Sequence, residues 1–453
     1  MISDMAKLAY LRIQRTFLSR RLMRIKKSFL LILCFCFFTA YSAQAEEVLV
    51  WEDCLIEAKK NNPDLISSVE SVKQSQADKK IVASALFPQI DADLGVSTTH
   101  TNSRNASTGV KSNTTTDNYT YGATASQLLF DGFKTVNNVK SASEDIKASQ
   151  QNFRYTSTTV RLALRTAFIN LLRSQELIKV VEEIVRIRRQ NLELITLRYQ
   201  SGLEHKGALL TAEADIAQAN FQLAQAKREL VLSQRQLTSA MGRDKFSPLL
   251  AKGDFTVKDS ANPKPDFDAL VKNNPSLLKA VAEKNSASYS IKSAYANFSP
   301  ELSGSAGASR SDSSWPPRSK SWNAGLTLTM PIFEGGLRFA QVSKAMAAYK
   351  QAEADEKSIK DSAVVSLESA WADLQDALET VTVQYKNLDA TVERSKIAEV
   401  QYSTGFIDFD NWTIIEDNLV SAKTAYLNAQ AGALLAEANW IQAKGETLEY
   451  AQN

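Results

Sequence analysis

Residue types that carry out catalysis or hold metal ions are scarce in this chain. It has two histidines, His100 and His205, and three cysteines, so a histidine or cysteine metal centre has little to be built from. No segment shows a nucleophile–base signature, and the glycine-containing segments match no phosphate-binding loop. We therefore expect a protein that is not an enzyme and that uses no cofactor and no metal.

Two glycine-containing turns hold the charged residues that could act on an ion or a partner. The first turn, at Gly202, is followed by Glu204, His205 and Lys206, and the second, at Gly405, by Asp408, Asp410, Glu416 and Asp417. Carboxylates gathered around one opening can select cations and gate it. We expect both glycines to supply the positive φ that the chain needs in order to reverse its direction.

Each of these turns also has a purely structural interpretation. Asp410 could be the N-cap of a helix that begins near Trp412, and one residue can both cap a helix and present a charge. The charged residues after Gly202 could equally be a solvated polar tip. Both interpretations stay open at this stage.

Long helices that keep a repeat of seven residues flank both turns. Leucine-rich positions recur at Leu164, Leu171, Ile178, Val185, Leu192 and Tyr199, and again at Leu209, Ile216, Leu223, Leu230 and Leu237. A sustained seven-residue repeat of apolar positions predicts coiled-coil packing. Alanines that recur with the same spacing at Ala212, Ala219 and Ala226 allow the helices to approach closely. A single helix over residues 133–199 would be about 100 Å long at 1.5 Å per residue. This is far longer than a bilayer is thick, so we expect the helix to extend through an aqueous compartment.

The chain is organised as two copies of one plan. Landmarks return 203 to 212 residues later: Asn62-Pro63 as Asn274-Pro275, Phe130-Asp131-Gly132 as Phe333-Glu334-Gly335, and Tyr199 to Gly202 as Tyr402 to Gly405. Each copy reads helix, strand, loop, strand, very long helix, turn, long helix. We expect a first repeat over 46–242, a linker over 243–266, a second repeat over 267–445 and a tail over 446–453.

Four strands are expected from apolar and polar alternation, at about 88–99, 118–130, 300–311 and 322–331. Ile90, Ala92, Leu94 and Val96, for example, share one face of the first strand. This pattern is typical of membrane barrels, although a half-buried soluble sheet would look alike. Four strands cannot close a barrel and open edges are forbidden in lipid, so several copies must share one barrel: two would give eight strands and three would give twelve.

Residues 1–45 read as a signal peptide, with the true start at Met1 or at Met23. Basic residues precede an apolar run, and Ala43-Gln44-Ala45 forms a small-x-small cleavage signal. This segment carries eight Lys/Arg and one Asp, so the whole-chain charge of +3 leaves the remainder at −4. Nucleic-acid binding loses its main support, because the excess of basic residues lies in the removed segment.

The repeated Asn-Pro helix start, the strand-to-helix junctions Leu129–Gly132 and Pro331–Gly336, and the turns Arg198–Gly202 and Gln401–Gly405 resemble those of the TolC family of outer-membrane efflux proteins. The resemblance covers nearly all of residues 46–445. It implies an α+β membrane protein: a homotrimer in outer-membrane lipid, in which a twelve-stranded β-barrel continues into a coiled-coil α-helical periplasmic barrel.

The resemblance also implies partners and roles for the two turns. A periplasmic adaptor and an inner-membrane pump are the expected partners, and the expected adaptor contacts are Gly202, Glu204, Lys206 and Gly405. In the family, acidic residues just after the second turn narrow the tunnel entrance, which makes Asp408, Asp410, Glu416 and Asp417 the candidates here. This chain has a longer stretch between Gly405 and its acids than the best-known members of the family.

Three hypotheses for function follow. The first is an outer-membrane exit duct that passively conducts small molecules or drugs. The second is the outer-membrane component of a type I protein secretion system, which the lack of a lipid-anchor cysteine favours weakly. The third, from a different class, is a coiled-coil surface protein. The exported substrate, the type of pump and the resting state of the entrance do not follow from the sequence.

Overall fold

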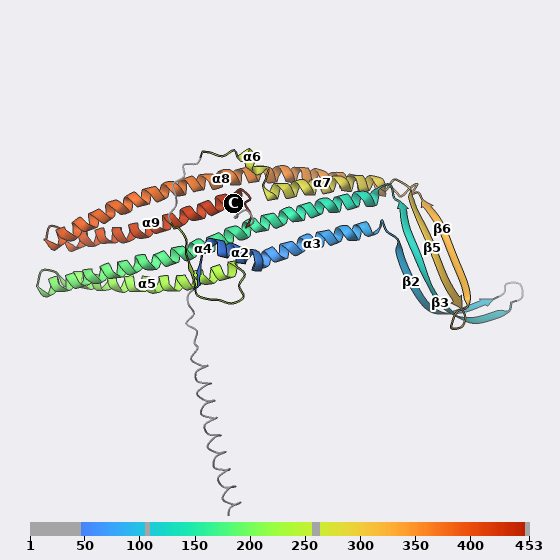
Figure 1. Cartoon of the computed structure of the whole chain (residues 1–453), viewed down its shortest axis with the longest axis horizontal. Coiled ribbons are helices and arrows are strands. Elements are labelled where there is room, and N and C mark those ends of the chain that lie inside the picture. Colours follow the sequence, from blue (N-terminus) through green and yellow to red (C-terminus); the bar gives the residue numbers. More distant parts are fainter. Residues whose placement is uncertain (1–46, 105–108, 256–262, 449–453) are drawn as a thin grey trace, which may run out of the picture. The chain divides into compact units, whose positions relative to one another are not determined.

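A computed structural model describes residues 47–104, 109–255 and 263–448. The expected signal peptide, residues 256–262 of the expected linker and residues 449–453 of the tail lie outside these ranges. The chain divides into two compact units. One unit comprises Met1–Val48 and Ser247–Leu249, and the other comprises Leu49–Phe246 and Leu250–Asn453. All the long helices and a four-stranded sheet belong to the second unit (Figure 1).

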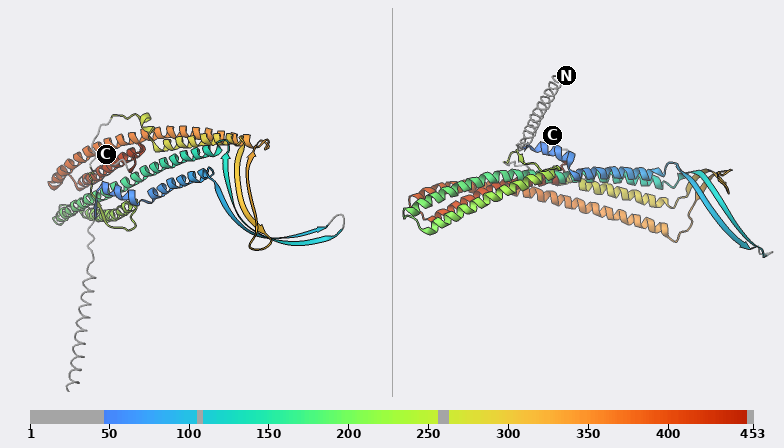
Figure 2. Two further views of the ribbon diagram at one scale, coloured as in Figure 1. Left: turned by 45° about the vertical axis from the view of Figure 1, so that its right-hand side comes forward. Right: turned by 90° about the horizontal axis from the view of Figure 1, so that it is seen from below.

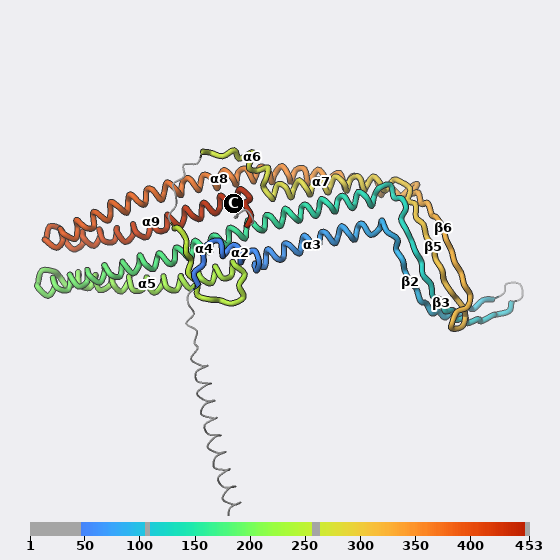
Figure 3. The backbone as a smooth tube through the Cα atoms, in the orientation of Figure 1, coloured from blue at the N-terminus to red at the C-terminus, as the bar shows by residue number. Residues whose placement is uncertain are grey.

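The second unit contains the same series of elements twice. The helices of the first half are α2 (Trp51–Asn61), α3 (Pro63–Ser84), α4 (Lys134–Gln200) and α5 (Lys206–Ala240). Those of the second half are α6 (Phe267–Val271), α7 (Pro275–Ala296), α8 (Leu337–Ser403) and α9 (Phe409–Ala443). Equivalent helices have equal lengths: 22 residues in α3 and α7, 67 in α4 and α8, and 35 in α5 and α9. The tube in Figure 3 lets the reader follow both series.

Asparagine and proline start the helix that leads into the strands of each half. The Asn62 side chain accepts hydrogen bonds from the backbone N–H of Asp64 and Leu65, and Asn274 accepts one from Ser276. Proline follows at the first helical position, where its missing N–H costs nothing. The structure adds the short helices α2 and α6 before these starts, so our expectation of one helix there was incomplete.

The sheet has the strand order β2-β3-β5-β6 and is antiparallel throughout. Its strands are β2 (Gln89–Arg104), β3 (Lys111–Phe130), β5 (Glu301–Asp312) and β6 (Ser319–Thr329), and the short strands β1 (Glu47–Leu49) and β4 (Leu249–Ala251) lie outside it. β2 and β3 are longer than expected. Thr98 donates to Asp117 at 2.7 Å, and β-branched threonines pair across the segment that we took for a loop, which favours continued pairing.

Several heptad positions face the helix interfaces, whereas Tyr199 is 39% exposed. Leu164 and Leu171 of α4 are fully buried, and the side chains at Ala212, Ala219 and Ala226 of α5 are at most 5% exposed. α4 packs against α3, α5, α7 and α9, and α8 packs against α7 and α9, so the α4–α5 hairpin and the α8–α9 hairpin meet through α4 and α9 (Figure 2). Within the described ranges, no helix combines the length and the apolar character that crossing a membrane requires.

Candidate functional site: the tips of the two helical hairpins

Both hairpins reverse through the same backbone motif. Gly202 has φ +73° and Gly405 has φ +81°, which confirms the expected positive φ. The N–H of Gly202 donates to the Tyr199 carbonyl at 3.0 Å, and the N–H of Leu203 donates to the Arg198 carbonyl at 2.8 Å. Gly405 and Phe406 make the equivalent two bonds. These paired bonds are a Schellman motif, which satisfies the last carbonyls of α4 and α8.

Each returning helix has its own side-chain cap. His205 Nδ1 accepts from the Ala208 N–H at 3.1 Å at the start of α5, and Asp408 Oδ1 accepts from the Asn411 N–H at 2.8 Å at the start of α9. Our expectation that Asp410 caps this helix was wrong. The helix begins at Phe409, one turn earlier than we expected, so the capping position falls on Asp408 and Asp410 lies in the first turn.

Aromatic side chains of the second hairpin fill the space against the first. The Tyr402 ring is stacked on the Trp412 ring at 4.5 Å with an interplanar angle of 4°, and Phe409 lies beside both. This group packs into one buried cluster with small or aliphatic residues of both hairpins: Ile195, Ala208, Ala212, Ala398 and Ile415. The tips are therefore held together by an apolar core of their own.

A polar link between the hairpins closes this core. The Tyr402 hydroxyl, on α8, donates to Glu204 Oε2 at 2.7 Å. Arg198 lies with its guanidinium 4.6 Å from the centre of the Tyr402 ring and with Nε 3.8 Å from Glu204 Oε2. Burial and the Glu204 carboxylate raise the pKa of Tyr402, so its hydroxyl stays protonated and acts as a donor. Glu204, with its side chain 10% exposed, thus faces the second hairpin rather than solvent.

The two acids deeper in α9 make different contacts. Glu416 is 4% exposed and accepts a hydrogen bond from the Ser395 hydroxyl at 2.5 Å, and burial raises the pKa of its carboxyl group. Asp417 is exposed and pairs with Arg188 of α4. Arg188 also lies 3.6 Å from Asp215 of α5, so it connects three helices.

The expected site residues therefore fall into two groups. Asp408, Asp410, Lys206, Gly202 and Gly405 lie exposed at the tips, whereas Glu204, Glu416 and Asp417 form contacts between the two hairpins or within one of them. We had not singled out Leu203 and Phe406, which are 68% and 83% exposed at equivalent positions of the two turns. The signal was present, because each is an apolar residue directly after a turn glycine.

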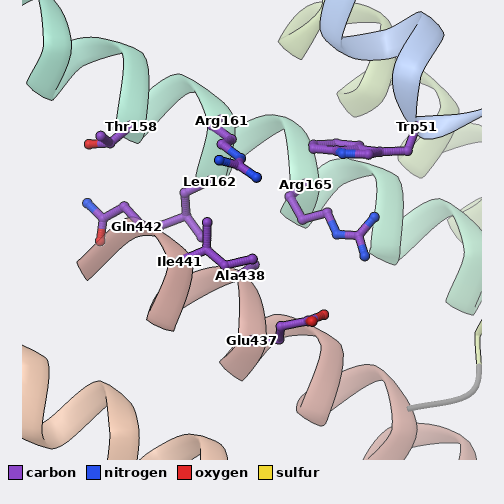
Figure 4. Close-up of a pocket in the computed structure, with 9 residues that line it drawn as sticks. All are labelled: Trp51, Thr158, Arg161, Leu162, Arg165, Glu437, Ala438, Ile441 and Gln442. Carbon is purple, nitrogen blue, oxygen red and sulfur yellow. The ribbon is translucent and has the colours of Figure 1, made fainter. Parts of the chain in front are cut away.

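A pocket further along the helices was also not expected from the sequence. It is lined by residues of α2, α4 and α9: Trp51, Thr158, Arg161, Leu162, Arg165, Glu437, Ala438, Ile441 and Gln442 (Figure 4). The Arg165 guanidinium lies 4.9 Å from the centre of the Trp51 ring, and Arg161 pairs with Glu446 at 3.2 Å. Burial lowers the pKa of Arg165. Residues 51, 161 and 446 are far apart in the sequence and share no local pattern, so the pocket could not be predicted from the sequence.

No catalytic chemistry is assembled at these places. In the described part of the chain, no three His, Cys, Asp or Glu side chains are grouped so that they could hold a metal ion. Cys54 is buried, and burial raises the pKa of its thiol to about 12, which makes it a poor nucleophile. The arrangement at the tips holds the two hairpins together through a buried apolar cluster and a few polar bonds.

Comparison with known proteins agrees with this architecture. A sequence model of the family described as outer membrane efflux protein matches residues 55–243 and 267–449. The chain is 23% identical over 419 residues to the outer membrane efflux protein BepC of Brucella suis, covering 90% of this chain and 88% of that protein. It is 24% identical over 415 residues to the outer membrane protein TolC of Escherichia coli, covering 86% and 80%.

Solved structures show the same fold. The Campylobacter jejuni CmeC outer membrane channel aligns with a TM-score of 0.77 at 18% identity, over 88% of this chain and 87% of that one. The open Neisseria gonorrhoeae MtrE outer membrane channel aligns with a TM-score of 0.75 at 18% identity, over 88% and 89%. Since the family match takes in both halves with their strands and hairpins, the chain belongs to the outer membrane efflux protein family, as an outer-membrane exit duct with a periplasmic extension.

Proposed function

We propose that three copies of this chain form the exit duct of a tripartite export system, which passively conducts small molecules from a periplasmic adaptor and an inner-membrane pump to the exterior. The observation that carries the proposal is the incomplete sheet. β2 and β6 each have one neighbour in the four-stranded sheet, and large apolar side chains on one face are exposed, among them Ile90, Leu94, Trp322 and Leu326.

An apolar face with open edges requires further strands in lipid. Backbone groups at a lipid-exposed edge would lack hydrogen-bond partners, so β6 of one copy must pair with β2 of the next. Four strands from each of three copies give a twelve-stranded barrel, and the family resemblance favours three copies over two. The helices of each copy continue from its strands and so share the symmetry of the barrel, which supports a helical tunnel below it.

The entrance of this tunnel belongs at the hairpin tips. Asp410 is exposed beside the capping residue Asp408, so three copies would surround the entrance with six carboxylates from these two positions. The double variant Asp408→Asn/Asp410→Asn should conduct with reduced cation preference or wider opening in planar bilayers. Asparagine can still cap α9, so the fold is kept. Single-channel conductance and ion selectivity that match the unmodified protein would refute the role of both acids.

The adaptor contact belongs at the same end. Gly202, Lys206 and Gly405 are exposed there with the apolar side chains of Leu203 and Phe406 between them, a mixture of exposed apolar and charged groups that suits protein contact. The expected contact at Glu204 is the least favoured, because its carboxylate is bound to Tyr402.

In vivo crosslinking from a photoreactive residue at Lys206 tests the partners. An adaptor of a proton-driven pump would support small-molecule efflux, and the adaptor of an ABC exporter would support type I protein secretion instead. Export of a small molecule has support from a relative, the pyoverdine export outer membrane protein OpmQ of Pseudomonas aeruginosa, which is 24% identical over 312 residues, 64% of this chain and 63% of that protein. Recovery of no periplasmic partner would contradict the proposal.

A further inference from the structure

The face of the sheet that carries the apolar side chains changes character near its outer end. Successive cross-strand rows on this face read Ile90–Ala125–Ala306–Ala324, then Ala92–Ala123–Ala308–Trp322, then Leu94–Tyr121–Arg310–Lys320. The third row thus places two cations side by side on β5 and β6. It lies next to the β5–β6 turn, which Figure 1 shows at the end of the sheet away from the helices.

Arg310 and Lys320 belong to the apolar face and not to the polar one. Side chains alternate along a strand, and Arg310 is in phase with Ala306 and Ala308. The opposite face carries the row Asp93–Gly122–Ser309–Ser321, and a Cβ atom built on Gly122 would lie 3.3 Å from Asp93 Oδ1 and 2.9 Å from Ser309 Cβ. The acids Asp91 and Asp93 therefore lie on the other side of the sheet from the two cations.

Neither cation has an anionic partner in the part of the protomer that the structure describes. Among residues 47–104, 109–255 and 263–448, no carboxylate lies within ion-pair distance of Arg310 or Lys320. Asp312, the nearest acid along the same face, accepts hydrogen bonds from the backbone N–H of Ser313 at 2.7 Å and of Arg318 at 3.3 Å. Its charge is directed into the turn, so the pair of cations is left uncompensated.

Aromatic side chains lie beside the pair on the same face. The Trp315 ring, from the β5–β6 turn, lies 6.3 Å from the Tyr119 ring and 6.2 Å from the Tyr121 ring, and Tyr121 is the cross-strand partner of Arg310. Trp322, two residues after Lys320, is 82% exposed. Tyrosine and tryptophan gather where a membrane protein passes from hydrocarbon to headgroups, so this row marks the outer interface of the apolar band.

We propose that Arg310 and Lys320 form a binding site for the phosphate groups of an anionic outer-leaflet lipid. The proposal rests on the proposed function, because the apolar face must be turned toward lipid. A cation on that face is costly in hydrocarbon but is stabilised at headgroup depth by phosphate, which Arg310 can bind through two N–H groups while Lys320 adds a compact charge. The rings of Trp315 and Trp322 then flank the headgroup.

The test is a lipid titration of the full-length protein in detergent. Micelles containing bis-phosphorylated lipid A are compared with micelles containing the same glycolipid after removal of its phosphates, and binding is followed by tryptophan fluorescence and by melting temperature. Each cation near an anionic surface contributes about fivefold in affinity, so two contribute roughly 30-fold. The phosphorylated lipid should bind the unmodified protein about 30-fold more tightly, and Arg310→Gln/Lys320→Gln should remove this preference.

The chain offers a matched control in Arg104→Gln/Lys111→Gln. These two cations are also cross-strand partners, but they lie ten residues further along β2 than Leu94, about 33 Å beyond the row of Arg310. The control should keep the full preference for phosphate. Exchange of the two residues in Arg310→Lys/Lys320→Arg, which preserves the charge, should also keep most of it.

Equal binding of the two lipids by the unmodified protein, or an unchanged preference in Arg310→Gln/Lys320→Gln, would overturn the site. Tight binding of inorganic phosphate alone would also overturn it, because the occupant would then be a free anion and not a lipid. Conductance of each variant in planar bilayers distinguishes failure of the lipid site from failure of the proposed channel function. A conducting channel without the lipid preference contradicts this inference alone, whereas an unmodified protein that never conducts contradicts the proposed function.

Discussion

The hydroxyl group of Tyr402 offers a way to weaken the link between the hairpins without disturbing their packing. Tyr402→Phe keeps the ring that is stacked on Trp412 and that lies under the Arg198 guanidinium. It removes only the donor to Glu204 Oε2 at 2.7 Å. A hydrogen bond to a charged group contributes about 1.5–3 kcal/mol, so the ratio of separated to joined hairpins should rise about 10- to 150-fold.

The surroundings of Glu204 favour the upper part of this range. The Tyr402 side chain is 1% exposed and that of Glu204 is 10% exposed, so water cannot readily replace the lost donor. Arg198 Nε, at 3.8 Å from Glu204 Oε2, is too far away for a direct hydrogen bond. The backbone N–H of His205 donates to the other carboxylate oxygen, Oε1, at 3.3 Å, so the Tyr402 hydroxyl is the one hydrogen-bond donor to Oε2 among the described residues.

Tyr199→Phe is the matched control, since Tyr199 holds the equivalent position in the first copy, 203 residues earlier, and is 39% exposed. Hydrogen–deuterium exchange at the ends of α8 and α9 should rise in Tyr402→Phe and stay unchanged in Tyr199→Phe, and single-channel recordings should show more frequent opening in the first variant only. Equal exchange and equal opening in the two variants would show that the hydroxyl does not hold the hairpins together.

Four further substitutions test the second hairpin. Burial raises the pKa of the Glu416 carboxyl group above 4.5, so its contribution to stability is present below pH 4.5 and is lost as the pH rises through the folded-state pKa. Glu416→Gln should therefore raise the melting temperature at pH 7 and not at pH 4. An equal shift of the melting temperature at both pH values would contradict this. Asp408→Ala removes the cap on Asn411 and should cost about 0.5–2 kcal/mol in chemical unfolding, while Asp408→Asn should cost little. Gly405→Ala forces a side chain into φ +81° and should cost about 1–2 kcal/mol by the same measurement, and a neutral result would rule out strain at the turn.

Periodicity and repetition predicted the elements that depend on local pattern. The long helix expected over residues 133–199 spans Lys134–Gln200, and the heptad positions Leu164 and Leu171 are fully buried. The alternation of Ile90 and Leu94 on one face is kept in the sheet register. These features follow from periods of two and of seven residues, which a single sequence carries in full.

Three features could not be obtained in this way. The segment over 99–117 is rich in Ser, Thr and Asn and looked like a loop, but pairing within the hairpin extends the strands over 99–104 and 111–117. Asp408 and Asp410 differ by only two positions, so a boundary error of one turn was enough to assign the wrong cap. The burial of Glu416 depends on Ser395 in another helix, a contact that no local pattern reveals.

The link between the hairpins also shows what duplication followed by divergence can build. The two copies keep the same backbone, because His205 and Asp408 cap equivalent helices and Gly202 and Gly405 turn equivalent corners. Their side chains are complementary rather than alike. The second copy supplies three large rings, and the first supplies Ile195, Ala208 and Ala212, which pack against them.

The charges are divided between the copies in the same way. Arg188 and Glu204 of the first copy bind Asp417 and Tyr402 of the second, so each copy carries one side of both of these polar links between the hairpins. The positions that meet are not equivalent ones: Tyr402 corresponds to Tyr199 and Asp417 to Ala214, whereas their partners are Glu204 and Arg188. The two tips of one chain are therefore held to each other by side chains that the other copy lacks at the equivalent positions, since Ala214 corresponds to Asp417 and Ile407 corresponds to Glu204.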